Sequence, residues 1–457
     1  MKATATNLPG TLTDWLSFLE TRRPEHQMVL GLERADRVAR TLLPAEIFTN
    51  QRRIKVITVA GTNGKGSTVA TLSALLKAAG IRAGAWTSPH LQQFNERICI
   101  DGEMVADPLI SDAFARIETL RGDDFLSYFE FGALAALDIF VRNEVDVIVL
   151  EVGIGGRLDA VNIIDADVSI VTTVDLDHQV WLGDTIEDIA REKAGIFRSG
   201  RPAICGEHHP ANSLTDYIRT INACELRRGE AFELDASRQA STGEINFRCR
   251  MPHHSTGHQS TGYHSTGHHS IGEDTARQLT HLPAPPLPLT SVACALQAFL
   301  WLYPETPDQI VRQGLADSRL SGRCQMMGAS NVLGEPVTVL LDVAHNPQAA
   351  RYLAEKVAGL EHPVAVMGIL NDKSLEGVID PLRQMFAHWH VATLDFPLRT
   401  RSGRELEQAL QAVGEPVTCH ETVADALAVA VANAAPATTV VVFGSFHTVA
   451  EAMTALR

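Results

Sequence analysis

The sequence predicts an α/β protein built from two domains, and three observations support this fold class. Apolar segments of strand length alternate with amphipathic segments of helix length from about residue 54 onward. The run 145–151 is almost wholly apolar, as in a strand that is buried on both faces of a parallel sheet. A second alternating series begins near residue 320. We therefore expect an N-terminal domain over 1–318 and a Rossmann-like C-terminal domain over 319–457.

Composition restricts the class of protein. The chain has 457 residues and a formal net charge of −15, which argues against general binding to nucleic acid or to anionic membranes. The seven cysteines are scattered without C-x-x-C spacing, so they predict neither a disulfide framework nor a zinc site. The N-terminus lacks the apolar core of a signal peptide, and no apolar run approaches the ~20 residues of a membrane span. We expect a cytoplasmic protein.

The expected elements follow in order along the chain. Thr185 is expected to cap a helix that runs to Ile196. The other helices are expected over 11–20, 32–43, 69–79, 107–121, 129–142, 290–302 and 375–388. Strands are expected over 56–60, 81–86, 97–101, 145–151, 167–174, 337–343, 363–369, 390–394 and 438–443.

One stretch, at about 236–280, is rich in His, Ser, Thr and Gly and interrupts this alternation. Its polar tract 251–272 cannot bury enough apolar surface to become ordered, so we expect a disordered insert. Metal binding by the interleaved histidines is the alternative.

A glycine-rich loop, Gly61-Thr-Asn-Gly-Lys-Gly-Ser67, follows the first strand. Glycines allow backbone N–H groups to approach phosphate oxygens, and the N-terminus of the following helix adds partial positive charge. Lys65 adds a full charge. The spacing differs from the common G-x-x-x-x-G-K-[ST] loop because Gly66 separates the lysine from the hydroxyl residue. The pattern favours nucleotide binding over the alternative, a strand–helix turn whose glycines serve only packing.

Polar residues at later strand ends are candidates for the same site. Glu151 ends the apolar strand, and the carboxyl ends of parallel strands converge, which favours magnesium binding over an ordinary strand-end carboxylate. His178 follows the next strand and either joins that site or is structural. Lys193 lies on a charged helix and is expected to be solvated. In the second domain, Asp342 either holds a ribose or caps a turn, and Arg323 either clamps phosphate or is exposed.

Taken together, the motifs resemble one family, the folylpolyglutamate synthases, which are Mur-type ATP-dependent amide ligases. The similarity is greatest to the bacterial bifunctional dihydrofolate synthase/folylpolyglutamate synthases and spans roughly 11–455, outside 236–280. It implies an N-terminal P-loop Mur-ligase-type ATPase domain that also binds a pterin. The motifs that carry it are Gly61–Ser67, Thr87–Leu91, Phe129–Phe131, Glu151–Ala160, Leu176–His178, Arg191–Gly195, Gly322-Arg323, Asp342–Pro347 and Gly444–Thr448.

The resemblance implies roles for individual residues. Lys65, His345 and Lys193, the last as a carbamate, would be catalytic. Magnesium would be held by Ser88, Glu151, His178 and Lys193. ATP would be bound by Thr62, Asn63, Gly64, Lys65, Gly66, Ser67, Ser291, Arg323 and Asp342. The pterin would be bound by Gln27, Met28, Val29, Leu30, Ser127, Tyr128, Phe129, Glu130, Leu158, Asp159 and Ala160.

The implied reaction joins L-glutamate to dihydropteroate and to the γ-carboxylate of reduced folates, with ATP as substrate and an acyl phosphate as intermediate. The implied cofactors are Mg²⁺ and a monovalent cation such as K⁺, and the implied state is a monomer that binds neither nucleic acid nor membrane. The chain departs from the family at three positions: Ser291 replaces a common asparagine, Val29 an aspartate and Ala133 a threonine.

Two other functions stay open. The first is a Mur-type ligase that acts on a cell-wall nucleotide, which would carry a UDP-recognising domain longer than the segment before the glycine loop. The second is a P-loop nucleotide switch, which would lack both the metal-binding set and a second α/β domain.

Overall fold

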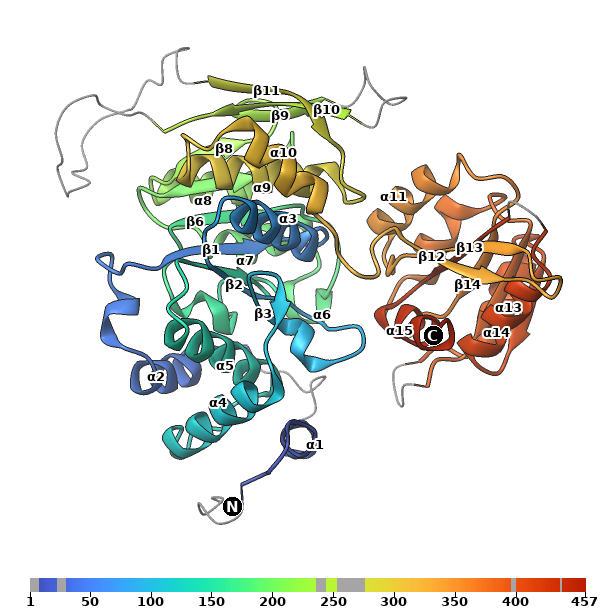
Figure 1. Cartoon of the computed structure of the whole chain (residues 1–457), viewed down its shortest axis with the longest axis horizontal. Helices are drawn as coiled ribbons and strands as arrows, with labels where there is room; N and C mark the ends of the chain where they lie inside the picture. The colour runs from blue at the N-terminus through green and yellow to red at the C-terminus, as the bar shows by residue number, and fades with distance from the viewer. Residues whose placement is uncertain (1–7, 23–29, 236–243, 253–275, 396–399, 436–437) are drawn as a thin grey trace. The chain divides into compact units, whose positions relative to one another are not determined.

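The computed structural model describes residues 8–22, 30–235, 244–252, 276–395, 400–435 and 438–457 (Figure 1). The chain forms two compact units. Unit 1 comprises Met1–Ser88 and Phe94–Ser318, and unit 2 comprises Pro89–Gln93 and Arg319–Arg457. Most of the histidine-rich tract lies outside the described residues, so its expected disorder and the metal-binding alternative stay predictions there.

The main sheet of unit 1 has eight strands in the order β4-β3-β2-β5-β1-β6-β7-β8. The strands are β1 (Lys55–Ala60), β2 (Ala83–Trp86), β3 (Ile98–Ile100), β4 (Glu103–Met104), β5 (Val147–Glu151), β6 (Val168–Val171), β7 (Pro202–Cys205) and β8 (Cys224–Arg227). All pairs are parallel except β2–β3 and β3–β4 at one edge. Val59 of β1 is paired with Glu151 on one side and Ile170 on the other, so three strand ends meet at one point.

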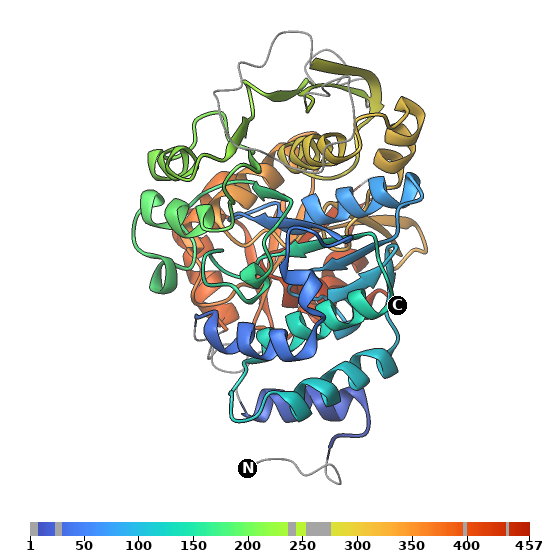
Figure 2. The same ribbon diagram turned by 90° about the vertical axis from the view of Figure 1, so that its left-hand side faces the viewer.

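Helices cover both faces of this sheet. Helices α3, α9 and α10 pack together on one face, and α2, α4 and α5 pack on the other (Figures 1 and 2). The helices are α1 (Leu12–Arg22), α2 (Glu33–Leu42), α3 (Lys65–Ala78), α4 (Asp107–Leu120), α5 (Tyr128–Arg142), α6 (Gln179–Leu182), α7 (Ile186–Ala194), α8 (Asn212–Thr220), α9 (Leu289–Leu302) and α10 (Asp308–Asp317). Short 3₁₀ helices are η1 (Ala45–Phe48), η2 (Phe94–Arg97) and η3 (Ala160–Ile163).

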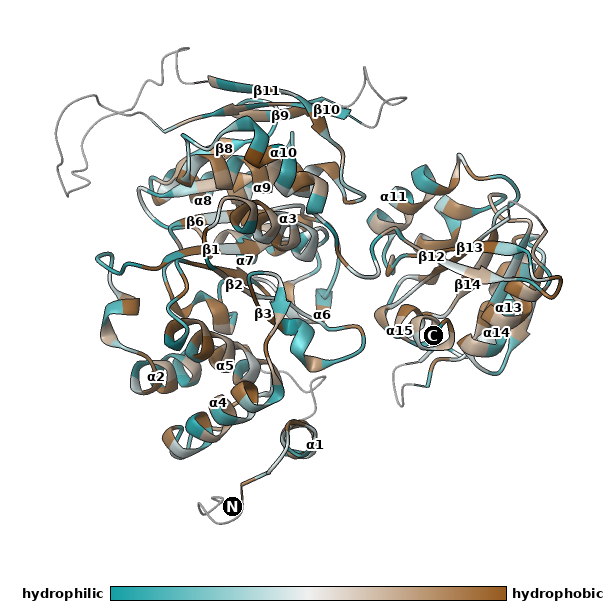
Figure 3. Cartoon of the chain, in the orientation of Figure 1, coloured by the Kyte–Doolittle hydropathy of each residue, from teal (hydrophilic) through white to brown (hydrophobic). Residues whose placement is uncertain are grey.

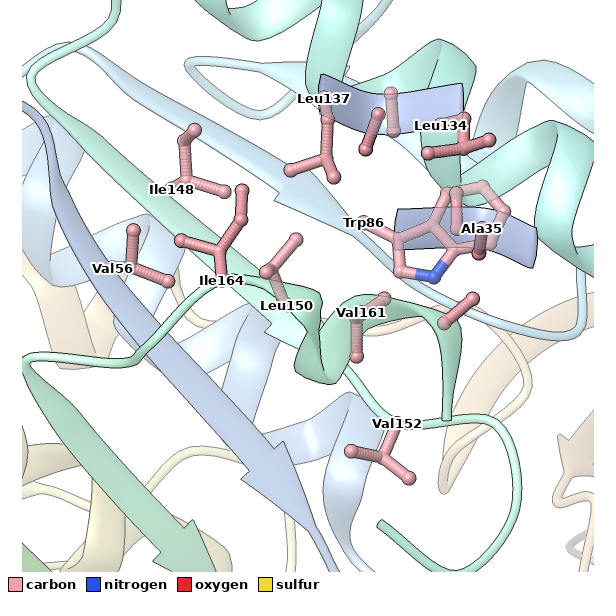
Figure 4. Packing of buried hydrophobic residues seen from close by; sticks show 14 of the residues in the cluster. Ala35, Val56, Trp86, Leu134, Leu137, Ile148, Leu150, Val152, Val161 and Ile164 are labelled. Atoms are coloured by element: carbon pink, nitrogen blue, oxygen red, sulfur yellow. The ribbon is translucent and has the colours of Figure 1, made fainter. Parts of the chain in front are cut away.

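A buried hydrophobic core between α5 and the sheet positions β2 and β5. Leu134 and Leu137 of α5 pack near Trp86 of β2 and Ile148 and Leu150 of β5, and all five side chains are fully buried (Figure 4). Burial of aliphatic and aromatic side chains of this size contributes roughly 1.5–3 kcal/mol each. Helix α4, which packs on α5, is amphipathic and shows both hydrophilic and hydrophobic colours (Figure 3). This packing holds the carboxyl ends of β2 and β5 in fixed positions.

A small antiparallel sheet corrects one expectation. It is formed by β9 (Phe232–Asp235), β10 (Glu244–Arg250) and β11 (Ala276–Pro283), in the order β11-β10-β9. The expectation of disorder over 236–280 is therefore wrong for β10 and for residues 276–280 of β11. In β10, buried Ile245, Phe247 and Cys249 alternate with more exposed residues, the period of a half-buried strand. This alternation was not predicted because the neighbouring tract 251–272 is strongly polar.

Unit 2 has a six-stranded sheet in the order β12-β13-β17-β14-β15-β16, parallel except for β12. The strands are β12 (Gln325–Ser330), β13 (Pro336–Leu341), β14 (Val364–Met367), β15 (His388–Ala392), β16 (Val417–His420) and β17 (Thr439–Phe443). The helices are α11 (Pro347–Val357), α12 (Leu375–Ile379), α13 (Gly403–Ala412), α14 (Val423–Ala432) and α15 (Phe446–Ala455), with the 3₁₀ turn η5 (Asp380–Leu382).

The expected α/β class with two sheet domains is confirmed. The expected helix 375–388 is too long, because the chain passes into a 3₁₀ turn at Pro381, which has no N–H to continue an α-helix. The next strand accordingly begins at His388 rather than at residue 390. No helix in the described ranges is long and apolar enough to cross a bilayer.

A histidine pair in unit 2 predicts sensitivity to acid. Burial, together with His388 and His420, lowers the pKa of His390 to about 4, and its Nδ1 lies 2.9 Å from Nε2 of His420. An unfolded chain binds this proton near pH 6.5. Between about pH 6.5 and pH 4 the unfolded state therefore binds more protons, so the free energy of unfolding should fall as the pH falls through this window. Above about pH 6.5, the contribution of neutral His390 to the free energy of unfolding is fully present.

The measurement is urea unfolding at several pH values, with hydrogen exchange of β15 and β16 as the local readout. The variant His390→Gln should have a flatter pH profile than the unmodified chain, whereas His362→Gln, at an exposed position, should not. An unchanged slope in His390→Gln would contradict the assignment.

Candidate active site

The glycine-rich loop between β1 and α3 has a backbone that only glycine fits. Gly61 has φ +150° and Gly64 has φ +84°. A Cβ on Gly61 would lie 1.9 Å from Oγ1 of Thr172, so any larger residue would push the loop away from β6. Lys65 begins α3, and its Nζ donates to the carbonyl oxygens of Gly61 and Thr62 at 3.0 and 3.3 Å. The lysine charge is thus held above the loop.

Threonine hydroxyls fix the loop from both sides. Thr172 Oγ1 donates to the carbonyl of Asn63 at 2.6 Å, and Thr173 Oγ1 accepts from the N–H of the same residue at 3.1 Å. Thr68 Oγ1 donates to the carbonyl of Gly64 at 2.9 Å. These partners come from the neighbouring strand end and from α3 itself, so the loop is anchored to both elements by hydrogen bonds.

The remaining residues of the loop lie in the same cluster. Thr62 Oγ1 exchanges two hydrogen bonds with the backbone of Asp175, and Ser291 donates to a loop carbonyl from the first turn of α9. Gly66 lies in the first turn of α3. Ser67 Oγ is buried and makes no hydrogen bond within the described residues, so this hydroxyl remains unsatisfied at the base of the loop.

Two of the expected metal ligands lie together. Glu151 is buried at the end of β5, and one of its carboxylate oxygens accepts from the N–H of Ser88, at the end of β2, at 3.2 Å. Hydroxyl and carboxylate oxygens are the ligands that hard divalent cations prefer, so this pair fits Mg²⁺ or Mn²⁺. His178 adopts φ +54° before α6, with Nε2 3.8 Å from a carboxylate oxygen of Asp177. Within the described ranges, no group of three or more His, Cys, Asp or Glu forms a metal-binding cluster.

Lys193 is not the solvated lysine that its charged helix predicts. Its side chain is buried, and burial, with the nearby charge of Lys65, lowers its pKa to about 7, while Asp177 acts in the opposite direction. A Cβ on Gly156 would lie 3.1 Å from the Lys193 carbonyl oxygen, so the glycine loop after β5 packs directly on the last turn of α7. Burial therefore favours the neutral form of the amine.

Asp159 organises the loop that follows Glu151. Its Oδ2 accepts from the N–H groups of Gly153 and Ile154 at 2.9 and 3.2 Å, and its Oδ1 accepts from that of Val161 at 3.1 Å. Burial raises its pKa to about 6, although these N–H groups and Lys65 favour the charged form. Its neighbours Leu158 and Ala160 belong to the same turn, of which η3 is the continuation.

The start of α5 adjoins this turn. A Cβ on Gly153 would lie 2.7 Å from the ring of Phe129, and Phe129 contacts Trp86 edge to face at 5.6 Å. Ser127 and Glu130 form a capping box, so their side chains bind the helix terminus. This region includes Tyr128, which is buried, and Leu30, which is partly buried before α2. Gln27, Met28 and Val29 lie outside the described residues, and pterin binding by the whole set stays a prediction.

Unit 2 carries its own group of expected site residues. Asp342 follows β13 and is buried, and its two oxygens accept from the N–H groups of Cys324 and Ala344 at 3.0 and 2.9 Å. Burial raises its pKa, and Arg323 acts in the opposite direction. Asp342 therefore does cap turns, the simpler of its two expected roles, and ribose binding stays a prediction. The Arg323 guanidinium lies 5.1 Å above the ring of Phe446.

His345 begins the turn into α11. Its Nδ1 lies 2.8 Å from the carbonyl oxygen of Val343. A carbonyl only accepts, so Nδ1 carries the hydrogen and Nε2 holds the lone pair of the neutral ring.

Comparison with known proteins identifies the family. Residues 59–206 match the Mur ligase middle domain and residues 322–446 match the Mur ligase glutamate ligase domain. The Escherichia coli dihydrofolate synthase/folylpolyglutamate synthase is 38% identical over 448 residues, which cover 97% of this chain and 94% of that protein. This chain belongs to the dihydrofolate synthase/folylpolyglutamate synthase family. The resemblance stated from the motifs is therefore confirmed.

Solved structures of this dihydrofolate synthase/folylpolyglutamate synthase family agree. Escherichia coli FolC in complex with DHPP and ADP matches with a TM-score of 0.82 and 37% identity, covering 97% of each chain. The bifunctional enzyme from Yersinia pestis, complexed with AMPPNP and Mn, matches with a TM-score of 0.82 and 39% identity, covering 98% of this chain and all of that one. These similarities run through both units, whereas a nucleotide switch would share only the first.

Sequence reasoning missed several residues that shape this site. In the sequence, Thr172 and Thr173 belong only to the expected strand 167–174. Their position directly after β6, which pairs with β1, brings them to the loop that follows β1. Arg34, which pairs with Glu130 at 2.7 Å, carried no local signal, because its partner lies almost a hundred residues away. The sequence alone assigns no role to Asp177, which opposes the fall in the pKa of Lys193.

The loop geometry predicts the effect of one methyl group. In Gly64→Ala, the new Cβ would lie 2.4 Å from Ser291 Oγ, so we expect the loop to shift and the affinity for ADP to fall at least about tenfold. Isothermal titration calorimetry would measure it. The matched control is Gly80→Ala, at the other end of α3, where φ is +70° and nothing lies within 4 Å. Both variants should lose roughly 1–2 kcal/mol of stability, and equal losses of ADP affinity would contradict the prediction.

Proposed function

We infer that this protein ligates L-glutamate to dihydropteroate, giving dihydrofolate, and to the γ-carboxylate of reduced folates, giving folylpolyglutamates. The observation that carries this proposal is the near full-length relationship to enzymes of that name; the contact between Glu151 and Ser88 and the buried Lys193 agree with it. The relatives' structures with ADP, AMPPNP, Mn and DHPP support ATP, a divalent metal and a pterin as ligands of this chain too.

The first step would activate the substrate carboxylate. A carboxylate oxygen attacks the γ-phosphorus of ATP, the bond to the β–γ bridging oxygen breaks, and ADP leaves. We propose that Lys65 and the N–H groups at the start of α3 bind the phosphates, because the loop already holds them in place. Arg323 is proposed to bind phosphate, and Asp342 to bind the ribose.

The metal would be held by Ser88, Glu151, His178 and a carbamate on Lys193. Oxygen donors dominate this set, and the buried amine with a lowered pKa is the nucleophilic form that adds CO₂. When bound, a Mg²⁺ ion would neutralise charge on the transferring phosphate. A monovalent cation such as K⁺ stays a prediction.

The second step would form the amide bond. The glutamate amine attacks the carbonyl of the acyl phosphate, a tetrahedral intermediate forms, and inorganic phosphate leaves with one oxygen of the original carboxylate. We propose that Nε2 of His345 accepts the ammonium proton, because its Nδ1 is engaged by Val343. Asp159 and Phe129 are proposed to hold the pterin ring, the former through a carboxyl with a raised pKa that can exchange a proton with it.

An isotope experiment tests this sequence of steps. Dihydropteroate with ¹⁸O in its carboxylate, ATP, Mg²⁺ and L-glutamate should give dihydrofolate, ADP and inorganic phosphate that carries one labelled oxygen. Mass spectrometry of the phosphate is the measurement, and tetrahydrofolate labelled at its γ-carboxylate serves in a second reaction. Unlabelled phosphate would rule out the acyl phosphate, and ADP release with no glutamylated product from either substrate would rule out the ligase.

The carbamate on Lys193 has a separate test. Lys193→Ala should reduce kcat by at least about a hundredfold, because an anion that holds the metal is lost. Acetate or formate should restore part of this activity by occupying the vacated space. Lys193→Met fills that space with a chain of similar length and should not respond. Equal responses of the two variants, or none in either, would contradict the role.

A further inference from the structure

Glu207 lies shortly after β7, at the same edge of the sheet as the glycine-rich loop. Its Oε1 accepts from the N–H of Val174, which lies beyond the end of β6, at 3.0 Å. Burial raises the pKa of the Glu207 carboxyl, and the Val174 N–H acts in the opposite direction. A half-buried carboxyl group therefore joins the ends of two neighbouring strands.

This contact extends the ladder between β6 and β7 by one side-chain hydrogen bond. The N–H of Gly206 donates to the carbonyl oxygen of Val171 at 2.9 Å, at the end of the backbone ladder. A Cβ on Gly206 would lie 2.3 Å from the carbonyl oxygen of Thr172, so the two chains run too close together there for a larger residue. The residue after it, Glu207, makes the next contact with its side chain.

The segment that Glu207 contacts has an irregular backbone. Residues 172–178 lie between β6 and α6. The Thr172 N–H still donates to the carbonyl oxygen of Ala60 in β1 at 2.9 Å, as a strand residue does. After Thr172 the chain leaves the regular ladder, so its position depends on individual contacts such as that with Glu207.

The same segment is bound to the glycine-rich loop. The N–H of Thr62 donates to the carbonyl oxygen of Thr173 at 2.8 Å, and the N–H of Asp175 donates to Thr62 Oγ1 at 3.0 Å. Val174 lies between these two partners of Thr62 in the chain. Hydrogen bonds between the loop and the segment hold the two together, and the bond from Glu207 connects both of them to the end of β7.

We propose that Glu207 is a positioning residue for nucleotide binding, which acts through Val174 and its neighbours on Thr62 and Asn63 of the glycine-rich loop. Asn63 is bound to the same segment, because its N–H donates to Thr173 Oγ1. The inference deepens the nucleotide binding of the function proposed above and rests on it. The effect on nucleotide affinity does not require the ligase reaction.

A second carboxylate provides a matched control at the opposite edge of the same sheet. Asp146 directly precedes β5, and its Oδ2 accepts from the N–H of Arg82, which directly precedes β2, at 3.3 Å. Like Glu207, it joins two neighbouring parallel strands through a bond from a side chain to a backbone N–H. Asp146 lies at the amino ends of its strands, whereas the glycine-rich loop follows the carboxyl end of β1.

The experiment compares four single variants: Glu207→Leu, Glu207→Asp, Glu207→Gln and Asp146→Leu. Leucine removes the acceptor, and aspartate keeps the charge on a side chain that is one methylene shorter. Both should raise the Kd for ADP roughly five- to tenfold, as the loss of one hydrogen bond predicts. Glutamine keeps an oxygen acceptor at the same reach and should resemble the unmodified protein. Asp146→Leu should lower Tm without changing ADP affinity.

The measurements are titration calorimetry with ADP and Mg²⁺ and steady-state kinetics. The KM for ATP should rise with the Kd for ADP in Glu207→Leu and Glu207→Asp, whereas the KM for glutamate should stay the same. Hydrogen exchange at residues 172–175 should become faster in these two variants and not in Glu207→Gln. If Glu207→Leu does not fold, the comparison of Glu207→Asp with Glu207→Gln decides the question.

Several results would overturn the proposal. Weak ADP binding in Glu207→Gln with normal binding in Glu207→Asp would show that the charge matters and the hydrogen bond does not. Unchanged binding in a folded Glu207→Leu or Glu207→Asp, or an equal loss in Asp146→Leu, would contradict it as well. The same holds if the unmodified protein binds no ADP. A protein that follows the expected pattern of ADP binding but ligates no glutamate would instead overturn the proposed ligase function alone.

Discussion

The pairing of β1 with β5 on one side and β6 on the other is the constraint on which the site depends. Backbone ladders place Val59 between Glu151 and Ile170, so the loop after β1 emerges between the ends of two other strands. Glu151 supplies a carboxylate at the end of β5, and Thr172 supplies a hydroxyl directly after β6, although the two residues are distant from the loop in sequence. Because parallel ladders fix the stagger of strands, the distances among these groups follow from backbone hydrogen bonds rather than from contacts among the polar groups themselves.

The second constraint is the burial of charge around that point. Lys193 and Asp159 are both buried near Lys65, and each shifts toward its neutral form: the pKa of the lysine falls and that of the aspartate rises. Burial disfavours the charged form of both groups. The positive charge of Lys65 disfavours charged Lys193 and favours charged Asp159. The two effects act together on Lys193 and against each other on Asp159. The neutral amine is the form that the proposed carbamate on Lys193 requires, whereas backbone N–H groups oppose the rise in the pKa of Asp159.

Sequence reasoning succeeded at three features whose signal is local. The glycine loop, the apolar strand ending in Glu151 and the capping of α7 by Thr185 each depend on neighbouring residues, and the structure has each of them. Burial of Lys193 could not be predicted, because it depends on the tertiary packing of α7, on whose backbone the distant Gly156 lies. The strands β10 and β11 were missed for a different reason: a polar tract between them dominated the composition of the whole segment.

Ser291 stands where the resemblance implies a common asparagine, and its hydroxyl supports the glycine-rich loop. Ser291 is short, buried and already donates to Gly64, so its side chain supports the loop from behind. A serine hydroxyl has one hydrogen to donate, and here the loop carbonyl takes it. We propose that the phosphates are bound by the backbone of this loop, whose carbonyl groups Thr68, Thr172 and Ser291 hold by hydrogen bonds.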